Sequence, residues 1–275
     1  MFSILIPTWN NLPYLKICVE SIRKNSSFAH EIILHINDGA DGSLQWAIQQ
    51  NIRYTHSPEN IGICKALNKA SELATADYIC YFNDDMYALP QWDYFLVKEI
   101  ELIGHSDFFL SSTMIEPKPG KDKNILQGFN FGDIQNFDEQ KLLNDYTSLQ
   151  MEDWNGASWP PNVMPKHLWD KVGGYSEEFS PGMYSDPDFS KKLWQEGVRY
   201  FKGIGHSKVY HFMSKSTHKI VKNDGRKQFM QKWQVTPSYF YCHMLQMGNV
   251  WKGILPTPPK SIAYWISKCK CMLSN

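Results

Sequence analysis

An excess of charge of either sign is missing from this 275-residue chain, in which 28 Lys and Arg side chains balance 28 Asp and Glu side chains. A basic surface is what draws proteins to nucleic acid or to anionic membranes, so bulk charge predicts no nucleic-acid partner. Any anion that the chain binds must therefore be held by local groups. Hydrophobic residues make up 43% of the chain, which is enough for a proper core and argues against disorder.

Long apolar runs are lacking as well. No uncharged stretch is long enough to cross a membrane, and the segment 1–7 has neither the basic start nor the long apolar core of a signal peptide. The few cysteines are scattered and fit free thiols in a reducing compartment better than a disulfide framework. These absences predict a cytoplasmic protein, either free or at the inner face of the membrane. The cysteines are Cys18, Cys64, Cys80, Cys242, Cys269 and Cys271.

Three familiar active-site motifs are also absent. No Gly-x-Gly-x-x-Gly follows the first expected strand, no Gly-Lys-Ser/Thr phosphate loop exists, and no Gly-x-Ser-x-Gly occurs. Their absence argues against a dinucleotide-dependent dehydrogenase, a phosphate-loop ATPase and an α/β-hydrolase, respectively.

The first half of the chain does contain a regular alternation of strand-like and helix-like segments. Short β-rich runs are separated by segments in which apolar residues recur at helical spacing. This alternation predicts an α/β fold with a Rossmann-like, mostly parallel sheet flanked by helices and joined by right-handed crossovers. The expected strands are 2–7, 31–36, 53–56 and 78–82, and the expected helices are 12–25, 44–50 and 63–74.

The second half is less regular. Residues 109–144 mix a Pro-Lys-Pro-Gly turn with polar loops and are predicted to run over the surface. A helix is expected over 166–172, and a second one runs to Trp194 from Asp186, which is the expected N-cap. Short strands are expected over 197–201 and 208–212. The tail from Asp224 onward is aromatic and basic.

The expected strand 78–82 ends abruptly in Asn83, Asp84 and Asp85. Two neighbouring carboxylates at the mouth of a buried strand repel each other and lose hydration unless a positive group sits beside them. A divalent cation that holds a phosphorylated ligand meets this need, and Mn²⁺ or Mg²⁺ prefers such oxygen ligands. We expect Asp85 to bind the metal and Asp84 to contact a ribose or sugar hydroxyl, and whether Asn83 adds a ligand is left open.

Polar residues also follow the other expected strands. Thr8 and Asn10 end the first strand, and Asp38 ends the second. In doubly wound sheets, ligands bind beyond the carboxyl ends of the strands. Each residue could be an ordinary turn residue on its own, but together they predict a shared nucleotide site with Asn83, Asp84 and Asp85.

Asp186 and Asp188 form a second acidic pair, preceded by a loop rich in glycine and aromatic residues. A carboxylate in such a place could act as a general base on an alcohol, and Asp186 is preferred. Capping of the helix would also explain Asp186. His211, at the end of an expected strand, could complete the metal site or contact a diphosphate.

In order and spacing, these segments resemble glycosyltransferase family 2, whose members have the GT-A fold. The resemblance covers roughly residues 1–215. The family usually has Glu where Ser185 stands and often Arg where Leu67 stands. The matching segments are 3–10, Asn37-Asp38-Gly39, Asn60-Ile61-Gly62 with Asn68, Asn83-Asp84-Asp85, Gly173-Gly174-Tyr175 and 185–189.

The resemblance implies an inverting, single-displacement sugar transfer. By this resemblance, Asp85 holds the metal on the diphosphate and the segment at Asp186 supplies the base, with Asp188 as the other candidate. The residues implied around the donor nucleotide are Pro7, Thr8, Asn10, Asp38, Asn60, Gly62 and Lys65, together with Asn83 and Asp84.

The implied organisation is a GT-A domain over 1–215, with a nucleotide-sugar half (1–105) and an acceptor half (106–215). A mainly helical extension (216–275) follows, as an acceptor lid, an oligomer contact or a membrane-surface patch. The expected reaction moves a sugar from a UDP- or dTDP-linked donor to a glycan or lipid-linked acceptor, in cell-surface polysaccharide or glycoconjugate biosynthesis. The alternatives are a nucleotidyltransferase with a similar sheet and a non-catalytic carbohydrate-binding scaffold.

Overall fold

The strands join into one continuous sheet in the computed structural model, which describes residues 1–214 and 222–273. Within these residues the order across the sheet is β3-β2-β1-β4-β9-β6-β10-β5, with β7 beside β6 and β8 beside β10. The strands are β1 (Phe2–Trp9), β2 (Glu31–Asn37), β3 (Arg53–Ser57), β4 (Tyr78–Tyr81), β5 (Met86–Ala88), β6 (Phe108–Glu116), β7 (Ile125–Gln127), β8 (Trp154–Asn155), β9 (Asn162–Pro165) and β10 (Tyr200–His211).

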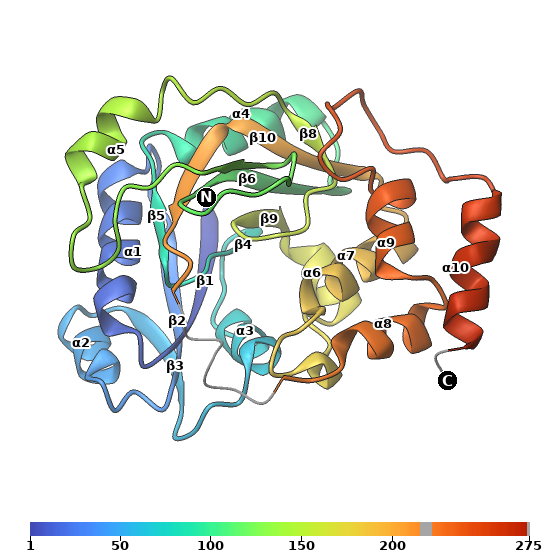
Figure 1. Ribbon diagram of the computed structural model, residues 1–275. Helices are drawn as coiled ribbons and strands as arrows, with labels where there is room; N and C mark the ends of the chain where they lie inside the picture. The colour runs from blue at the N-terminus through green and yellow to red at the C-terminus, as the bar shows by residue number, and fades with distance from the viewer. Residues whose placement is uncertain (215–221, 274–275) are drawn as a thin grey trace.

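Helices pack on both faces of this sheet (Figure 1). The predicted α/β fold with a mostly parallel sheet flanked by helices is therefore confirmed. The helices are α1 (Leu12–Asn25), α2 (Ser43–Gln49), α3 (Ile63–Ser71), α4 (Trp92–Ile103), α5 (Glu139–Asp145), α6 (Lys166–Val172), α7 (Ser185–Gln195), α8 (Gly225–Trp233), α9 (Pro237–Tyr239) and α10 (Ile262–Met272), with short turns η1 (Glu177–Phe179) and η3 (Phe240–Met244).

The N-terminal half has the parallel arrangement that the sequence predicts. In β1, Leu5 pairs with Ile33 of β2 on one side and with Tyr81 of β4 on the other. Side chains alternate between the faces, so Ile4 and Ile6 join the core under α1, α2 and α4, whereas Leu5 joins the core under α3, α6 and α7. Because β1, β2 and β4 run parallel, the residues that follow them emerge at one edge of the sheet.

A strand from the second half of the chain lies beside β4. β9 pairs antiparallel with β4, where Ile79 faces Met164, and antiparallel with β6 on its other side, where Val163 faces Leu110. The expected donor and acceptor halves therefore share a single sheet.

The prediction that residues 109–144 run over the surface is wrong for the first of these residues. They belong to β6, an interior strand whose nine residues are all buried. The polar run Ser111, Ser112 and Thr113 conceals this in the sequence. In the structure these hydroxyls are satisfied internally: Thr113 donates to the Ile204 carbonyl over 2.9 Å, and the Ser112 hydroxyl lies 2.7 Å from that of Ser207.

The end of the segment predicted as a strand over 197–201 and most of the one predicted over 208–212 belong to a single twelve-residue strand, β10, whereas residues 197–199 precede it. Its pairing with β6 shifts register between Ile204 and Lys208. An irregularity of this kind breaks the alternation of side chains, which is why the pattern appears as two strands in the sequence. The strand ends at His211 and so carries this residue to the edge where β1 and β4 end.

The C-terminal extension is mainly helical, as the sequence predicts. Phe229 of α8 and Phe240 of η3 are buried in the core that also contains residues of α3 and α6, whereas α10 lies at one end of the molecule (Figure 1). The expected boundary at 215/216 falls in 215–221, outside the described residues. Among the helices that the structure describes, none is both long and apolar enough to cross a bilayer.

Candidate active site

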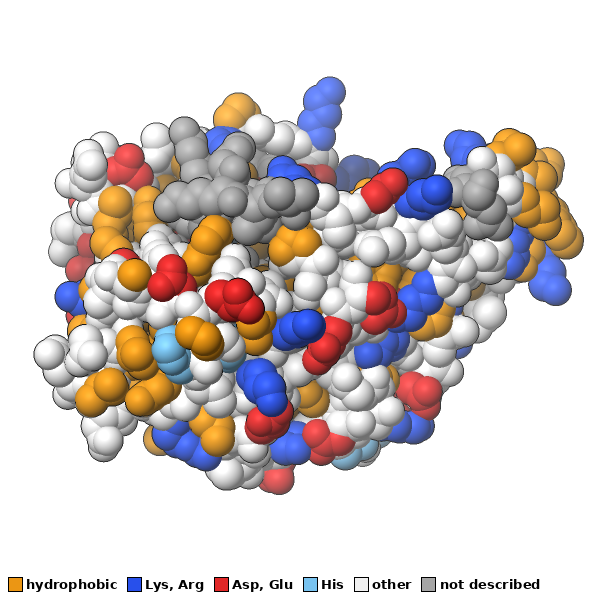
Figure 2. All heavy atoms as spheres, turned by 90° about the horizontal axis from the view of Figure 1, so that it is seen from below, with side chains coloured by type: hydrophobic (Ala, Val, Ile, Leu, Met, Phe, Trp, Pro, Cys, Tyr) orange, Lys and Arg blue, Asp and Glu red, His pale blue; other side chains and the backbone are white. Residues whose placement is uncertain are grey.

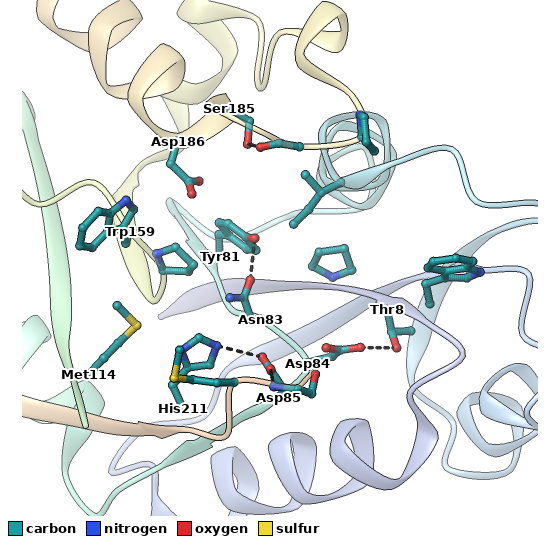
Figure 3. Close-up of a pocket in the computed structure, with 18 of the residues that line it drawn as sticks. Thr8, Tyr81, Asn83, Asp84, Asp85, Met114, Trp159, Ser185, Asp186 and His211 are labelled. Carbon is teal, nitrogen blue, oxygen red and sulfur yellow. Dashed lines mark hydrogen bonds and ion pairs between the residues drawn. The ribbon is translucent and has the colours of Figure 1, made fainter. Parts of the chain in front are cut away.

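A pocket of about 610 Å³ opens at the carboxyl ends of β1 and β4 (Figure 3). Its wall is completed by residues that are distant in the sequence: Glu116 at the end of β6, Asp186 on the first turn of α7 and His211 at the end of β10. The sequence-predicted residues that line it are Pro7, Thr8, Asn60, Gly62, Asn83, Asp84, Asp85, Asp186 and His211.

The Asp84 carboxylate is buried at the floor of this pocket. One oxygen accepts a hydrogen bond of 2.6 Å from the Thr8 hydroxyl, and the other accepts one of 3.1 Å from the Asn11 amide. Burial and the neighbouring charge of Asp85 raise the pKa of Asp84 to about 7 in spite of these bonds. Asp84 therefore holds a proton in about half of the molecules at neutral pH.

Asp85 lies next to a positive group. Burial by itself would raise its pKa, but the charge of His211 and hydrogen bonds from His211 and Ser214 lower it. The Ser214 backbone N–H donates to Asp85 over 2.8 Å, and Nε2 of His211 lies 3.4 Å from the other carboxylate oxygen. At neutral pH, Asp85 is therefore an anion.

His211 stands between two carboxylates, because its Nδ1 lies 2.8 Å from Glu116 Oε1 while its Nε2 faces Asp85 (Figure 3). Burial lowers the pKa of His211, but the two carboxylates outweigh burial and raise it to about 10. Sequence reasoning missed Glu116. It ends the strand β6, and that strand was hidden by its polar centre.

A divalent cation fits beside Asp85 and His211 only if a bound diphosphate supplies further ligands. No group of three or more His, Cys, Asp or Glu side chains within the described residues is arranged to hold a metal ion. Asp85 supplies a carboxylate oxygen that faces the pocket, whereas His211, which is protonated at neutral pH, supplies its Nε2 only when a bound cation displaces the proton. Mg²⁺ and Mn²⁺ commonly take few protein ligands and complete their coordination with substrate phosphates and water. These two residues therefore suit a metal that binds with a diphosphate.

Three of the predicted donor residues do not line the pocket. The Asn10 amide donates to Asp38 over 2.7 Å, so these two side chains are paired with each other, and both backbones have positive φ angles, of 46° and 63°. Lys65 is exposed on α3. In contrast, Asn37 lines the pocket although it was not singled out, and its side-chain oxygen accepts a hydrogen bond of 2.9 Å from the Ile61 N–H.

Asp186 faces the carboxylate pair from the opposite wall (Figure 3). Its expected role as N-cap is wrong, because α7 begins at Ser185 and its N-cap is Tyr184, with a left-handed backbone (φ 68°). The side chain is therefore free to point into the pocket, where it accepts a hydrogen bond of 3.0 Å from the Tyr175 hydroxyl. Burial raises the pKa of Asp186 to about 7, although the bond from Tyr175 opposes this rise.

Asp188 lies one half-turn further along α7, outside the residues that line the pocket. One of its carboxylate oxygens accepts a 2.8 Å hydrogen bond from the Trp233 indole and lies 3.0 Å from the Lys232 ammonium. The side chain is fully buried. Asp188 thus connects α7 to α8.

Comparison with known proteins gives a match to one protein family and to one curated relative. The family described as Glycosyl transferase family 2 matches residues 3–152. Among curated proteins, the "Putative glycosyltransferase EpsH" of Bacillus subtilis (strain 168) is 28% identical over 95 residues, which span 33% of this chain and 27% of that protein. The chain thus covers only about a quarter of this relative.

Solved structures share the fold at low sequence identity. S. aureus TarS 1-349 in complex with UDP-GlcNAc has a TM-score of 0.62 and 16% identity, over 85% of this chain and 65% of that one. GalNAc-T7 with UDP, GalNAc and Mn²⁺ has a TM-score of 0.61 and 17% identity, over 88% of this chain and 50% of that one. These similarities identify the fold as that of GT-A glycosyltransferases.

Proposed function

Since this chain belongs to glycosyl transferase family 2, we propose that it is an inverting, metal-dependent glycosyltransferase that uses a UDP- or dTDP-linked sugar. The observation that carries the proposal is the placement of Asp186 across one pocket from Asp84, Asp85 and His211. A cation-binding wall and a carboxylate with a pKa near neutrality thus face each other, with space for a donor between them.

The donor nucleotide is proposed to lie along the ends of β1 and β2. Pro7, Asn37 and Asn60 line this part of the pocket and offer an apolar surface and amide groups to a base and a ribose. Asp84, held by Thr8, presents a carboxylate to a hydroxyl of the ribose or of the sugar. Asn10, Asp38 and Lys65 stay predictions as donor contacts.

The diphosphate is proposed to lie near Asp85 and His211. A divalent cation bound here would neutralise the charge that develops on the departing nucleoside diphosphate. Mn²⁺ suits this donor set, because one ligand is a carboxylate and the other an imidazole once the metal has displaced the proton of His211. Glu116 would orient the ring of His211 through Nδ1, the nitrogen that does not face Asp85.

Asp186 is proposed as the general base. Its pKa near 7 makes it a carboxylate in about half of the molecules at neutral pH, able to take the proton of an acceptor hydroxyl as the oxygen attacks the anomeric carbon. The new glycosidic bond forms on one face of the sugar while the bond to the diphosphate breaks on the other, so the anomeric configuration inverts. Asp188 is the weaker candidate because its carboxylate is tied to Lys232 and Trp233.

The acceptor is proposed to enter beside Trp159, which lines the pocket near Asp186 and whose ring lies 6.1 Å from that of Tyr241. Aromatic faces of this kind pack against sugar rings. A glycan or lipid-linked acceptor in cell-surface polysaccharide or glycoconjugate biosynthesis fits such a wall.

The test compares Asp186→Asn with Asp188→Asn in two measurements. The first is release of nucleoside diphosphate from UDP- and dTDP-sugars, with water or an added glycan as acceptor. The second is calorimetric binding of UDP with Mn²⁺. We expect Asp186→Asn to lower turnover by about 10²-fold or more while binding is kept. Retained turnover in this variant, or an equal loss in a folded Asp188→Asn variant, would remove Asp186 as the base.

The metal site is tested separately with Asp85→Ala. We expect this variant to lose Mn²⁺-dependent UDP binding, and undiminished binding would contradict the assignment. A parallel incubation with UTP or dTTP and a sugar 1-phosphate separates the alternative functions, because a nucleotidyltransferase would release pyrophosphate there and a non-catalytic scaffold would release no product in either incubation.

A further inference from the structure

Large apolar side chains are exposed mainly in the C-terminal extension. Elsewhere in the described residues, strongly exposed apolar side chains occur singly, as at Ile48 on α2 and Leu102 on α4. Isolated exposed residues of this kind are normal in proteins, whereas a cluster marks an interaction surface. Val250 and Ile254 lie in the loop before α10, and the residues that share α10 and its end are Ile262, Trp265, Ile266, Met272 and Leu273.

Helix α10 packs on the protein through a side that includes Ala263, Tyr264, Ser267 and Cys271. Ser267 is buried, and its hydroxyl accepts a 2.7 Å hydrogen bond from the Thr236 N–H, while Cys271 is buried on the same side. At 100° per residue, the exposed apolar side chains of the helix fall within an arc of about 120° on the opposite side. This apolar stripe consists of Ile262, Trp265, Ile266, Cys269, Met272 and the adjoining Leu273.

Helix α10 therefore has a second apolar side that faces solvent, in addition to the side that packs on the protein, whereas a surface helix usually has one. Figure 2 shows the result as a group of hydrophobic side chains at the α10 end of the molecule, with Lys and Arg side chains around it. The exposed fractions are large, at 80% for Ile262, 57% for Trp265 and 69% for Met272.

Positive charge surrounds the stripe. From residue 225 to the end of the chain there are seven Lys and Arg residues and no Asp or Glu. The chain has no net charge because this basic segment is balanced by an excess of Asp and Glu in residues 1–224. On the helical wheel, Lys268 and Lys270 fall on the two sides of the stripe, and Lys260 is exposed just before the helix.

We propose that the apolar stripe of α10 inserts into the surface of an anionic lipid bilayer, with the helix lying in the plane of the membrane. A helix of eleven residues is too short to cross a bilayer, but it can bury one apolar side at the boundary between headgroups and acyl chains. Trp265 would lie at headgroup level, and the lysines on both sides would extend to the lipid phosphates.

The charge pattern favours lipid over a second copy of this chain. In a two-fold dimer through the stripe, the lysines beside it would face the same lysines of the other copy, and no Asp or Glu side chain occurs from residue 225 onward to balance them. Anionic headgroups supply this balance on every side. The inference does not depend on the donor pocket, so its test needs no enzymatic activity.

The apolar part of the proposal is tested by sedimentation of the full chain with vesicles. We compare phosphatidylcholine alone with phosphatidylcholine containing phosphatidylglycerol, for wild type and for Ile262→Glu with Met272→Glu. The matched control carries Ile48→Glu with Leu102→Glu, which adds the same charge at exposed apolar positions elsewhere. We expect the α10 variant to bind the anionic vesicles at least about tenfold more weakly, and the control to bind with at most a small electrostatic loss.

The ionic part is tested with Lys260→Gln and Lys268→Gln, against Lys98→Gln and Lys121→Gln as exposed controls on other segments. We expect roughly fivefold weaker binding for each lysine removed from the extension. Raising the salt from about 0.1 M to about 1 M should weaken wild-type binding, because the Debye length falls from about 10 Å to about 3 Å.

The depth to which α10 inserts is tested with brominated lipids. They should quench the tryptophan fluorescence of the wild type more than that of Trp265→Phe. Equal vesicle binding by the two glutamate variants would overturn the proposal. The proposal would also be overturned if the wild type did not bind anionic vesicles and light scattering showed a dimer that the α10 substitutions dissociate.

Discussion

The hydroxyl of buried Tyr175 donates a 3.0 Å hydrogen bond to Asp186, from behind the wall of the pocket. This bond favours the ionised form of Asp186 and so opposes the effect of burial on its pKa. Tyr175 also stacks on Phe189, with ring centroids 4.5 Å apart, so a phenyl ring can replace the phenol without loss of packing.

Tyr175→Phe should therefore move the acidic limb of the pH–rate profile upward. Asp186 acts as a carboxylate, so activity rises as pH increases through its pKa, which is about 7 in the wild type. Loss of the bond raises that pKa further, and turnover should fall severalfold near pH 6 but approach the wild-type value at high pH. The measurement is nucleoside diphosphate release against pH.

Tyr87→Phe is the control, because it also removes a buried phenol but one that contacts Asn25 and Glu139, away from the pocket. A profile for Tyr175→Phe that falls equally at every pH would contradict a role of the hydroxyl in setting the pKa of Asp186.

Without metal, the Asp84→Asn variant should gain stability relative to the wild type as the pH rises. The folded pKa of Asp84 is about 7, raised by burial and by Asp85, against its ordinary value of 3.8 in the unfolded chain. The folded state keeps a proton that the unfolded state has lost, so the wild type loses stability between about pH 4 and pH 7. Asparagine has no such titration.

The free energy of unfolding of Asp84→Asn minus that of wild type should thus increase across this window, by up to about 4 kcal/mol. Urea denaturation in the presence of a chelator, at several pH values, measures this difference. A difference that stays constant with pH would show that Asp84 is already ionised in the folded protein at low pH.

Asp93→Asn should destabilise the fold without altering the pocket. The carboxylate of Asp93 accepts hydrogen bonds from the Ser27 and Phe28 N–H groups and lies 2.9 Å from His30, with both side chains almost fully buried. Removing the charged acceptor of buried hydrogen bonds costs about 1–3 kcal/mol. Burial opposes ionisation of Asp93, but its partners lower its pKa, so its contribution is present above about pH 4 and is lost as the pH falls through the folded pKa.

Asp170→Asn is the matched control, because it breaks a pair with Lys166 on the surface of α6 and should change the free energy of unfolding by less than about 0.5 kcal/mol. Denaturant unfolding measures both variants. An equal loss of unfolding free energy in the two variants would contradict a larger contribution from the buried pair of His30 and Asp93.

The thiols should differ sharply in reactivity. Burial raises the pKa values of Cys18, Cys64 and Cys80, which keeps them protonated and out of reach of reagents. Cys242 and Cys269 are exposed. Under native conditions iodoacetamide should modify these two first, and the other thiols should react only after unfolding, as peptide mass spectrometry would show. Rapid native modification of Cys80 would indicate that the central sheet opens.

The sequence predicts the N-terminal half of the site well, because each strand there is a short apolar run that ends in a polar turn. The run Tyr78–Tyr81 followed by Asn83, Asp84 and Asp85 is the clearest case, since hydrophobicity and charge change at the same point. The parallel arrangement then follows from the alternation of strands and helices.

The second half is less predictable for a physical reason. The β6 hydroxyls find their partners in β10 and in the loop before β9, and no local pattern reveals such distant bonds. Glu116 was missed together with β6. Asn10 and Asp38 are polar residues after strands, as expected, but they bond to each other, a pairing that depends on the backbone geometry of two separate turns.

The position of β9 affects how the protein can be synthesised. β4 ends at Tyr81 and its neighbour β9 begins at Asn162, about 80 residues later. At roughly 5–20 residues per second, the ribosome needs about 4–16 s to supply that neighbour. During this time the N-terminal part of the nascent chain has an unpaired, β-rich edge of the type that pairs with other chains. Completion of this sheet therefore depends on keeping the edge of β4 separate from other chains until translation has passed residue 165.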